Sequence, residues 1–461
     1  MTSVAPGASQ HLQITPANTL SNGLISFKGG APVIQFIIGE QDRLLIGKSV
    51  RLCGKFRVKL NDETSANNVV GNANPVAGNR VDSLNLHMPA RLGTYSMIDQ
   101  LVIKSQETHQ VIEHIRHYSR FASSFIPITT SMGDQKTHLS QTALSMPSYD
   151  AQKHSVVDMP SQFLDGNSFC MSLPCGLFNG TQDIPLSSSW GLKGLLVEVH
   201  LAPDNNVLFD IEGTSPVPFP NAHYELSDVK LVAEAIQPTA QQLSGYSSGG
   251  TTFEYNSISS YFASVNSTNA ILNFQLGLSR VLGVFVNFIP SEYINNFSYD
   301  GTASGPLVNA GGGVANINQV VFTRGGTRFP LEYNIDTIQK SDPGTDGALV
   351  VDSQVMRNFL NSVKSFSGNS RMSASSRNTW VQDSTVVSQK LASLKSPDGG
   401  QVFGVGVSYD NISGDGVDFS KENWGLQMDL GLTSNRAHAA YVFVHSKQTL
   451  VFSEQGLQVI A

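Results

Sequence analysis

The chain has 461 residues, of which 40 % are hydrophobic and only 14 % are charged, and its formal net charge is −7. A disordered chain would combine low hydrophobicity with high net charge, and a nucleic-acid grip would need a basic stripe, so both classes are disfavoured. The length suits two large β domains, because all-β sandwiches often contain roughly 200–250 residues each.

The N-terminus, MTSVAPGASQHLQ, has neither a basic n-region nor an apolar h-region, so we expect no secretory signal peptide. We predict that residues 1–13 form a flexible arm, as untethered termini usually do. No apolar stretch reaches the ~18 residues that a transmembrane helix needs, so no membrane span is expected. The three cysteines, Cys53, Cys170 and Cys175, are an odd number and are predicted to be free thiols, mainly buried, in a reducing compartment.

The first half of the chain alternates between apolar segments and polar loops rich in turn-forming residues, which predicts strands. We expect these strands at Leu24–Phe27, Val33–Ile38, Leu45–Leu60, Tyr95–Lys104, Ser168–Leu173, Gly194–Leu201 and Tyr224–Ile236. The clearest pattern lies within Ser49–Leu60, where apolar residues such as Leu52 and Phe56 alternate with basic residues such as Arg51 and Lys55. This period of two predicts a half-buried strand.

One helix is predicted at Val111–Phe125, because Ile112, Ile115, Ala122 and Phe125 recur at helical spacing. A second, shorter helix is predicted at Ser353–Val363. The strands of the second half are expected at Phe253–Val265, Ala270–Leu276, Val281–Ile289, Gln319–Thr323, Gln401–Tyr409, Gly425–Leu432, Ala439–Ser446 and Thr449–Ile460.

A boundary between two halves is predicted at residues 238–250, PTAQQLSGYSSGG, whose composition is that of a linker. Three segments of the first half reappear in the same order in the second half, at offsets of 219, 234 and 217 residues. The pairs are Ile98–Lys104 with Ile317–Arg324, Trp190–Leu201 with Trp424–Leu432, and His223–Ala233 with Ala440–Val451. Such similar offsets predict two copies of one β unit of roughly 220 residues.

A unit with about eight strands, long loops and a helix in one connection is typical of a jelly roll. We therefore predict an all-β fold of two tandem eight-stranded jelly rolls, with a short helix in a loop of each. The predicted domains are an N-terminal arm (1–13), a first jelly roll (14–237), a linker (238–250) and a second jelly roll (251–461).

These segments, in this order, resemble the double jelly-roll major capsid proteins of polinton-like viruses, virophages and adintoviruses. The resemblance runs from about Ile14 to the C-terminus and rests on the opening strands in Ile14–Val58, on Tyr95–Phe125, on the strands in Ile184–Phe209 and His223–Ile236, and on the closing hairpin in Tyr441–Ala461.

The resemblance implies a structural protein without enzymatic activity: a subunit that forms pseudo-hexameric trimers, which tile the icosahedral shell of a DNA virus. It implies further copies of the chain, penton proteins and other minor capsid proteins as partners, and no sequence-specific nucleic acid. The expected location is the virion capsid, assembled inside the host cell. The long loops Asn61–Met88, Asp204–Ala222, Tyr299–Asn316 and Lys364–Val386 are candidates for the capsid exterior or for intersubunit contacts.

No catalytic, cofactor-binding or metal-binding residue is assigned, and no cofactor is expected. His109, His114 and His117 match no closed metal motif, and the glycines in Asn309–Val314 and Thr323–Arg328 are expected in a loop and a hairpin turn rather than a phosphate-binding loop.

The alternative functions are a carbohydrate-binding β-sandwich or adhesin, in which exposed aromatics would bind sugar, and a glycoside hydrolase, which needs two close carboxylates. Trp190 and Trp424 are candidate sugar platforms, but the pattern favours buried anchors.

Overall fold

The computed structural model describes about two thirds of the chain, and all structural statements below concern this part. The described residues are 9–18, 23–30, 32–60, 86–88, 92–144, 167–180, 182–189, 191–212, 215–217, 222–247, 252–266, 269–291, 294, 319–331, 353–366, 404–409, 415–429, 437–453 and 456–461. Most of the predicted loop residues, among them all of 299–316, lie outside these ranges, as does Trp190.

The first half of the chain forms two antiparallel sheets. Along one sheet the strands are β1 (Ser9–Ile14), β12 (Ala222–Ile236), β3 (Leu44–Leu60) and β7 (Asn167–Ser172), with β8 (Ile184–Pro185) also paired to β3. Along the other they are β2 (Val33–Ile38), β9 (Leu195–Leu201), β5 (Ile98–Ser105) and β6 (Val111–Ile115). A small separate sheet joins β11 (Ser215–Val217), β10 (Phe209–Glu212) and β4 (Leu86–His87).

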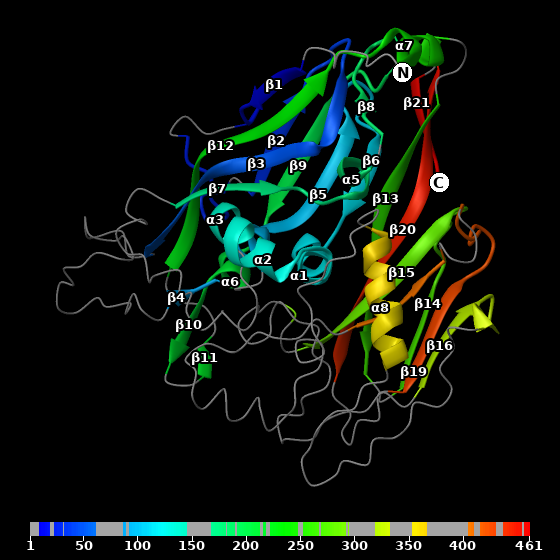
Figure 1. Ribbon diagram of the computed structural model, residues 1–461. Helices are drawn as coiled ribbons and strands as arrows, with labels where there is room; N and C mark the ends of the chain where they lie inside the picture. The colour runs from blue at the N-terminus through cyan, green and yellow to red at the C-terminus, as the bar shows by residue number, and fades with distance from the viewer. Residues whose placement is uncertain are drawn as a thin grey trace, which may run out of the picture.

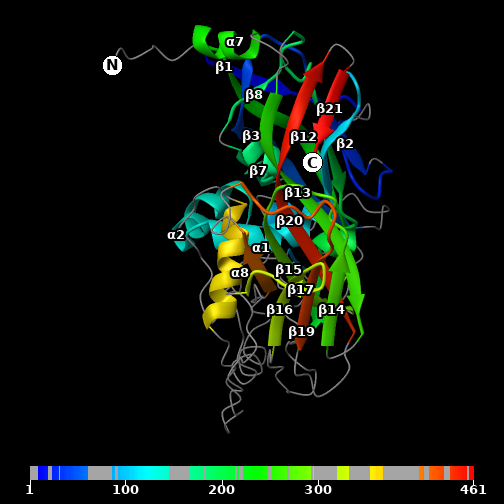
Figure 2. The same ribbon diagram turned by 90° about the vertical axis from the view of Figure 1, so that its right-hand side faces the viewer.

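The second half also forms two antiparallel sheets, seen at the right of Figure 1 and turned toward the viewer in Figure 2. One contains β13 (Thr252–Val265), β20 (His438–Ser453), β15 (Val281–Pro290) and β18 (Gly404–Ser408), with β21 (Gly456–Ile460) paired to β20. The other contains β14 (Asn269–Phe274), β19 (Trp424–Asp429), β16 (Gln319–Arg324) and β17 (Thr327–Arg328).

Both halves have the same connectivity. When the eight main strands of each half are counted in chain order, one sheet has the order 1-8-3-6 and the other 2-7-4-5, in both halves. This is an eight-stranded antiparallel double sheet in which the first and last strands are neighbours, as in a jelly roll. The protein is therefore a double jelly roll, and the predicted fold class is confirmed.

The three sequence matches correspond to equivalent strands of this topology. Strands β5 and β16, β9 and β19, and β12 and β20 occupy the same positions in their sheets. The internal similarity between the halves therefore reflects a repeated unit, and the shared order of the matches was the informative part of the signal.

The alternation of apolar and basic residues in β3 orients its side chains as predicted. Leu52, Phe56 and Val58 are buried with at most 2 % of their surface exposed, whereas Arg51 and Lys55 are partly exposed on the other face. The buried faces of all four large sheets contribute to one connected hydrophobic core that extends from the first half into the second. The two sandwiches thus share a core where they meet.

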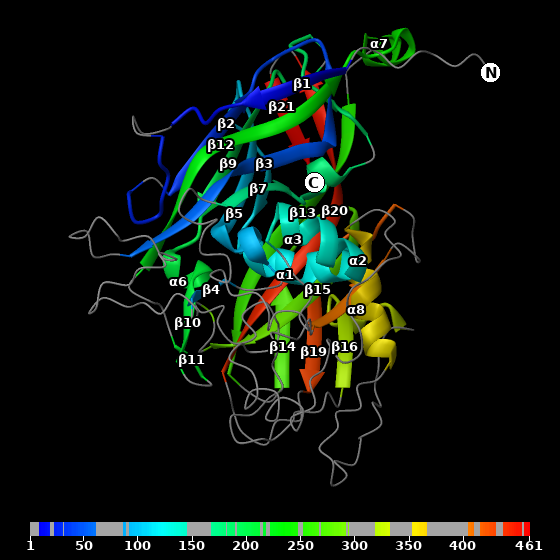
Figure 3. The same cartoon turned by 60° about the vertical axis from the view of Figure 1, so that its left-hand side comes forward.

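A helix follows the fifth strand of each sandwich. These helices, α1 (Tyr118–Thr129) and α8 (Ser353–Ser365), lie near each other on one side of the molecule (Figure 3). The helix predicted at Ser353–Val363 is confirmed. The shorter helical segments are η2 (Gly93–Met97), α2 (Met132–Asp134), η3 (Gln135–Leu139), α3 (Ser140–Thr142), α5 (Gly176–Asn179), α6 (Asp204–Val207) and α7 (Ala240–Ser247).

The helix predicted at Val111–Phe125 is wrong in its first part. Residues 111–115 form strand β6, which completes the sheet by pairing with β5, and the helix begins only at Tyr118. His117, with a left-handed φ of 55°, makes the corner between them. Ile112 and Ile115 fit a strand and a helix equally well over so short a segment, so the open edge of β5 decides the outcome.

The predicted N-terminal arm needs correction, and the predicted linker contains a helix. Residues 9–13, assigned to a flexible arm, form most of β1, which pairs with β12 from Ser9↔Ile236 to Ile14↔Leu231. Within the predicted linker 238–250, residues 240–247 form helix α7, whose first turn is capped by Thr239 and Gln242. The strand β1 is short and polar, and it forms because it pairs with β12, which is distant in the chain. Its own residues therefore show no pattern that would predict a strand.

The glycine-rich segment Thr323–Arg328 is a hairpin turn, as predicted. Thr323 pairs with Arg328 and Arg324 with Thr327, leaving Gly325 and Gly326 as the two turn residues with φ of 56° and 84°. Positive φ at both positions is what a tight two-residue hairpin requires, which explains the paired glycines. The strands predicted at Ala439–Ser446 and Thr449–Ile460 prove to be one long strand, β20, followed by a hairpin to β21.

Candidate functional site

The feature that makes the two sandwiches one body is the surface along which they meet. From the first sandwich it contains β6, α1 and α5, and from the second β13, β15, β20 and α8. Three layers of contacts hold it: a buried carboxylate, a set of polar side chains, and a cluster of aromatic rings.

The buried carboxylate is that of Glu113 in β6, which is 2 % exposed. Its Oε1 accepts hydrogen bonds from the backbone N–H groups of Gly176 and Ile258, both at 2.8 Å, and its Oε2 accepts one from Leu177 at 2.9 Å. Ile258 belongs to the second sandwich and the other two to the first. One side chain therefore links the main chains of both sandwiches.

Burial raises the pKa of Glu113 to about 7, although the three N–H donors act in the opposite direction. The ionisable side chains around it are Cys175, Tyr118 and Tyr255, whose own pKa values are raised by burial, so they are neutral near pH 7. The carboxylate is thus stabilised mainly by oriented N–H dipoles, an arrangement that satisfies its lone pairs without a counter-ion.

This raised pKa predicts a pH dependence of stability. Between about pH 4.5 and 7 the folded protein retains a proton on Glu113 that the unfolded chain has released, so the free energy of unfolding should fall as the pH rises through this window. Urea denaturation of the wild type and of Glu113→Gln at a series of pH values isolates the group, because other titrations cancel in the difference. A difference that stays constant from pH 4 to 8 would contradict the assignment.

Polar side chains bridge the two sandwiches beside Glu113. The hydroxyl of Tyr255 donates to the carbonyl oxygen of Ile112 at 2.8 Å, and the Oγ of Ser260 accepts from the N–H of Arg116 at 2.9 Å. These contacts bind β13 to the strand β6 and to the corner that follows it, so the second sandwich supports the position of the helix α1.

A second polar group lies at helix α1. Arg120 is 2 % exposed, its guanidinium donates to the carbonyl oxygen of Ile294 at 3.2 Å, and it lies 5.8 Å from the ring centre of Tyr441. Burial lowers the pKa of Arg120 to about 10, so it remains protonated at neutral pH. Asn287 of β15 donates to the Oγ of Ser124 at 2.7 Å. Buried polar contacts of this kind fix one relative orientation, because any other would leave the groups unsatisfied.

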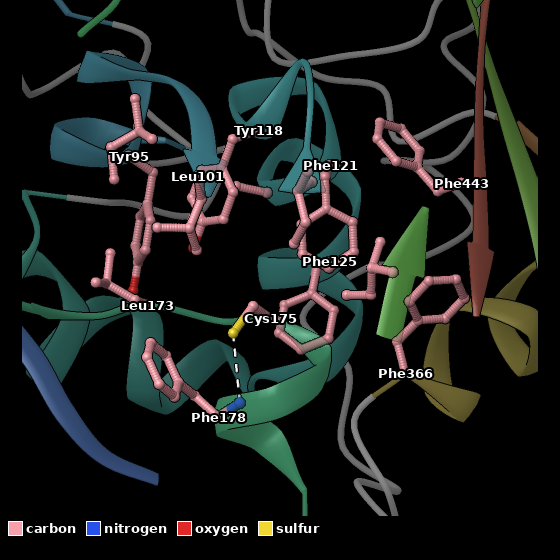
Figure 4. Packing of buried hydrophobic residues seen from close by; sticks show 14 of the residues in the cluster. Tyr95, Leu101, Tyr118, Phe121, Phe125, Leu173, Cys175, Phe178, Phe366 and Phe443 are labelled. Carbon is pink, nitrogen blue, oxygen red and sulfur yellow. Dashed lines mark hydrogen bonds between the residues drawn. The ribbon is translucent and has the colours of Figure 1, made fainter. Parts of the chain in front are cut away.

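The aromatic layer is centred on Phe121 of α1, which is fully buried. Figure 4 shows Phe121 and Phe125 between Tyr118 on one side and Phe366 and Phe443 on the other. The centre of the Phe121 ring lies 5.6 Å from that of Phe443 and 6.0 Å from that of Phe366, both in the second half of the chain. These separations are typical of favourable aromatic pairs. Helix α1 therefore places aromatic side chains between the two sandwiches, and we call these side chains the aromatic wedge.

Gly176 allows the closest approach of the two main chains. A Cβ atom at this position would lie 2.4 Å from the carbonyl oxygen of Asn256 and 2.7 Å from the Cα of Ser257, both in β13.

We expect Gly176→Ala to lower the free energy of unfolding by about 2–3 kcal/mol, because neither backbone can move without disturbing the bonds to Glu113. Chemical denaturation measures this, with Gly39→Ala, where no atom lies within 4 Å of a Cβ, as a control that should be near neutral. Equal effects of the two substitutions would contradict the close approach.

The three histidines that were considered as metal ligands lie in different surroundings. His114 contacts the Oε1 of Gln100 at 2.9 Å, the His117 ring packs 4.9 Å from that of Tyr441, and His109 is exposed. Within the described ranges, no three His, Cys, Asp or Glu side chains are gathered as for a metal ion. No helix among the described residues is long and apolar enough to cross a membrane.

Trp424 is a buried anchor, as predicted, and its ring N–H donates to the Tyr409 hydroxyl at 3.2 Å. It therefore offers no platform to a sugar. The carboxylate of Glu198, which is 7 % exposed, forms an ion pair with Lys104 at 2.7 Å. All three cysteines are free thiols; Cys53 and Cys175 are buried and Cys170 is partly exposed.

Glu113 was not predicted from the sequence. The available signal was a single carboxylate two residues before Ile115, which on a strand lies on the same face as that buried residue. A lone Glu on an apolar strand face indicates a buried, hydrogen-bonded carboxylate, because an unsatisfied one would be too costly. The prediction of a helix over these residues concealed that pattern.

No family model matches the chain, and no curated protein matches its sequence. Solved structures do match. The crystal structure of PBCV-1 VP54 fitted into a cryo-EM reconstruction of the virophage Sputnik has a TM-score of 0.54 and 10 % identity, covering 100 % of this chain and 98 % of the other. The quasi-atomic model of the PBCV-1 virus capsid has a TM-score of 0.52 and 9 % identity, with the same coverage. At this level of identity the likeness shows the fold alone.

Proposed function

We propose that this protein is the major capsid protein of an icosahedral DNA virus. The observation that carries the proposal is that two sandwiches of identical strand order are joined by one buried core and by Glu113 into a single unit. Of the two solved structures that share this fold over 98 % of their length, one is described as the PBCV-1 virus capsid and the other as a PBCV-1 protein fitted into a reconstruction of the virophage Sputnik. Such a function needs shape and interfaces rather than a reactive centre.

Three copies of the chain would form the capsomer. Each chain supplies two sandwiches of the same topology, so a three-fold ring presents six similar units and packs as a pseudo-hexagonal tile. Closed symmetric rings are the common form of homo-oligomers, and many modest contacts between tiles add up in a closed shell. The low proportion of charged residues, 14 %, suits a surface that neighbouring copies cover.

We assign the first jelly roll to residues 9–236 and the second to 252–461, with α7 in the connection between them. The first boundary takes in β1, which the pairing with β12 makes part of the first sandwich. Penton and other minor capsid proteins would be the further partners, and the virion capsid, assembled inside the host cell, would be the location.

Two measurements on the purified chain test the proposal. Light scattering during size-exclusion chromatography should give a stable particle of three 49.6-kDa chains, and negative-stain images should show hexagonal tiles or closed shells. A chain that remains monomeric at all concentrations and forms no tiles would overturn the proposal. Binding of glycans by such a monomer would instead support the carbohydrate-binding alternative.

A further inference from the structure

Two of the three cysteines, far apart in the sequence, face each other across a pair of strands. Cys53 in β3 lies directly opposite Cys170 in β7 in the antiparallel register. Opposite residues in such a pair have Cα atoms roughly 4.5–5.5 Å apart, which is within the range of about 4.4–6.8 Å that disulfides span. The main-chain geometry therefore permits a bond between the two sulfur atoms.

The two thiols share the outer face of their sheet. Leu52, Phe169 and Met171, the adjacent residues on the two strands, are buried in the core, so Cys53 and Cys170 point to the opposite side. Cys53 is 8 % exposed, and Cys170 is exposed to an intermediate degree. A small reagent in solution can therefore reach Cys170 first.

The surroundings of the pair are electropositive. Lys230 is opposite Cys53 on its other side, in β12, and Arg51 lies two residues away along β3. Burial, and then the hydrogen bond with Cys170, raise the pKa of Cys53 to about 12, while Lys230 and Arg51 act to lower it. These cations oppose the effect of burial on Cys53 and attract an anionic oxidant to the site.

We propose that Cys53 and Cys170 are a redox-active dithiol, which a small anionic disulfide such as oxidised glutathione converts to a cross-strand disulfide. The thiolate of Cys170 attacks one sulfur of the oxidant, breaks its S–S bond and releases one thiolate. The thiolate of Cys53 then attacks the sulfur of Cys170, forms the protein disulfide and releases the second thiolate. The protein loses two protons and two electrons, and the oxidant gains both the protons and the electrons to become two thiols.

The bond would fasten the outermost strand of its sheet. Among the described strands, β7 pairs with β3 alone, so it is an edge held by one row of hydrogen bonds. A disulfide would also close the chain between residues 53 and 170, which restricts the unfolded state. Opposite Cβ atoms in a sheet are slightly farther apart than a relaxed disulfide prefers, so the bond should be reversible by thiols. This inference does not depend on the proposed capsid function.

The test is oxidation of the reduced, full-length chain in buffers with increasing ratios of oxidised to reduced glutathione. After denaturation and alkylation, mass spectrometry should find two of the three thiols unreactive, a chain lighter by two hydrogens, and a peptide in which Cys53 is joined to Cys170. Cys175 is the internal control, because it is buried on a different strand connection and should remain alkylatable.

Matched variants sharpen the result. Cys53→Ser and Cys170→Ser should each abolish the cross-link, with Cys53→Ser retaining a mixed disulfide with glutathione at Cys170. Oxidation should raise the thermal midpoint of the wild type and leave that of both variants unchanged. Three alkylatable thiols at the most oxidising ratio, a cross-link that includes Cys175, or only intermolecular disulfides would each overturn the proposal.

Discussion

Glu113→Ala is expected to lower the free energy of unfolding by about 3–5 kcal/mol, the largest effect we predict for a single polar side chain in this protein. The substitution leaves the N–H groups of Gly176, Leu177 and Ile258 without their acceptor inside the protein. Each buried donor without a partner costs about 1–3 kcal/mol, and recovery of the cost of burying the carboxylate offsets part of the sum.

The measurement is urea denaturation together with hydrogen exchange. Exchange should accelerate at these three amides, and the single unfolding transition should separate into two as the sandwiches lose their link. Glu113→Gln should fall between wild type and Glu113→Ala, because an amide oxygen replaces one of the two acceptor atoms. Glu254→Ala is the matched control: Glu254 lies in β13 but is exposed and paired with Arg280, so its loss should cost no more than about 1 kcal/mol. If both alanine variants were equally stable, the role assigned to Glu113 would be wrong.

Phe121→Ala is expected to lower the free energy of unfolding by about 3–5 kcal/mol, as large-to-small substitutions of buried phenylalanines do. The ring is fully buried and contacts aromatic rings of both halves of the chain. Its removal opens a cavity lined by Phe125 of α1, by Phe285 and Phe443 of one sheet and by Phe366 at the end of α8, so the cavity cannot readily collapse. The loss should appear in the chemical denaturation midpoint, and it should weaken assembly because the two sandwiches would no longer hold one orientation.

Phe262→Ala provides the comparison. Phe262 of β13 also contacts the other sandwich, through His117 of the first with ring centres 5.8 Å apart, but it is 43 % exposed. Because half-exposed rings bury less surface, this variant should lose at most about half as much stability as Phe121→Ala. A loss as large as that of Phe121→Ala would mean that the aromatic wedge is not the main apolar link between the sandwiches.

The two variants probe one property: the rigidity of the pair of sandwiches. A tile that packs against neighbours along several edges must hold those edges at fixed angles, and a flexible link between its halves would add an entropic cost to every contact. The polar layer sets the orientation and the aromatic layer supplies most of the apolar burial. Because the hydrogen bonds of Glu113 help to set the orientation of the two sandwiches, a carboxylate without a counter-ion is retained in the core.

Much of the fold could be predicted from the sequence because the strands carry their own pattern. The period of two in β3, the apolar run of β15 and the hairpin glycines at 325 and 326 each follow from local chemistry. The repeat was also visible, because equivalent strands appear in the same order in both halves. What these patterns have in common is that burial on one face or a required φ selects the residue types directly.

The remaining features depended on partners distant in the chain. Val111–Ile115 became a strand because β5 offers an open edge, and Ser9–Ile14 became one because β12 does. The opposition of Cys53 and Cys170 follows from a strand register that no local pattern specifies.

By itself, the amino-acid sequence determined the class of fold, the number of repeated units and the positions of most strands, because hydrophobic periodicity and turn chemistry act over a few residues. The tertiary structure decided how the two units are joined: it placed Glu113 against the main chain of β13, wedged Phe121 between the sandwiches and set Cys53 beside Cys170. Contacts of this kind join residues more than a hundred positions apart, so their free energy appears only when the chain is folded.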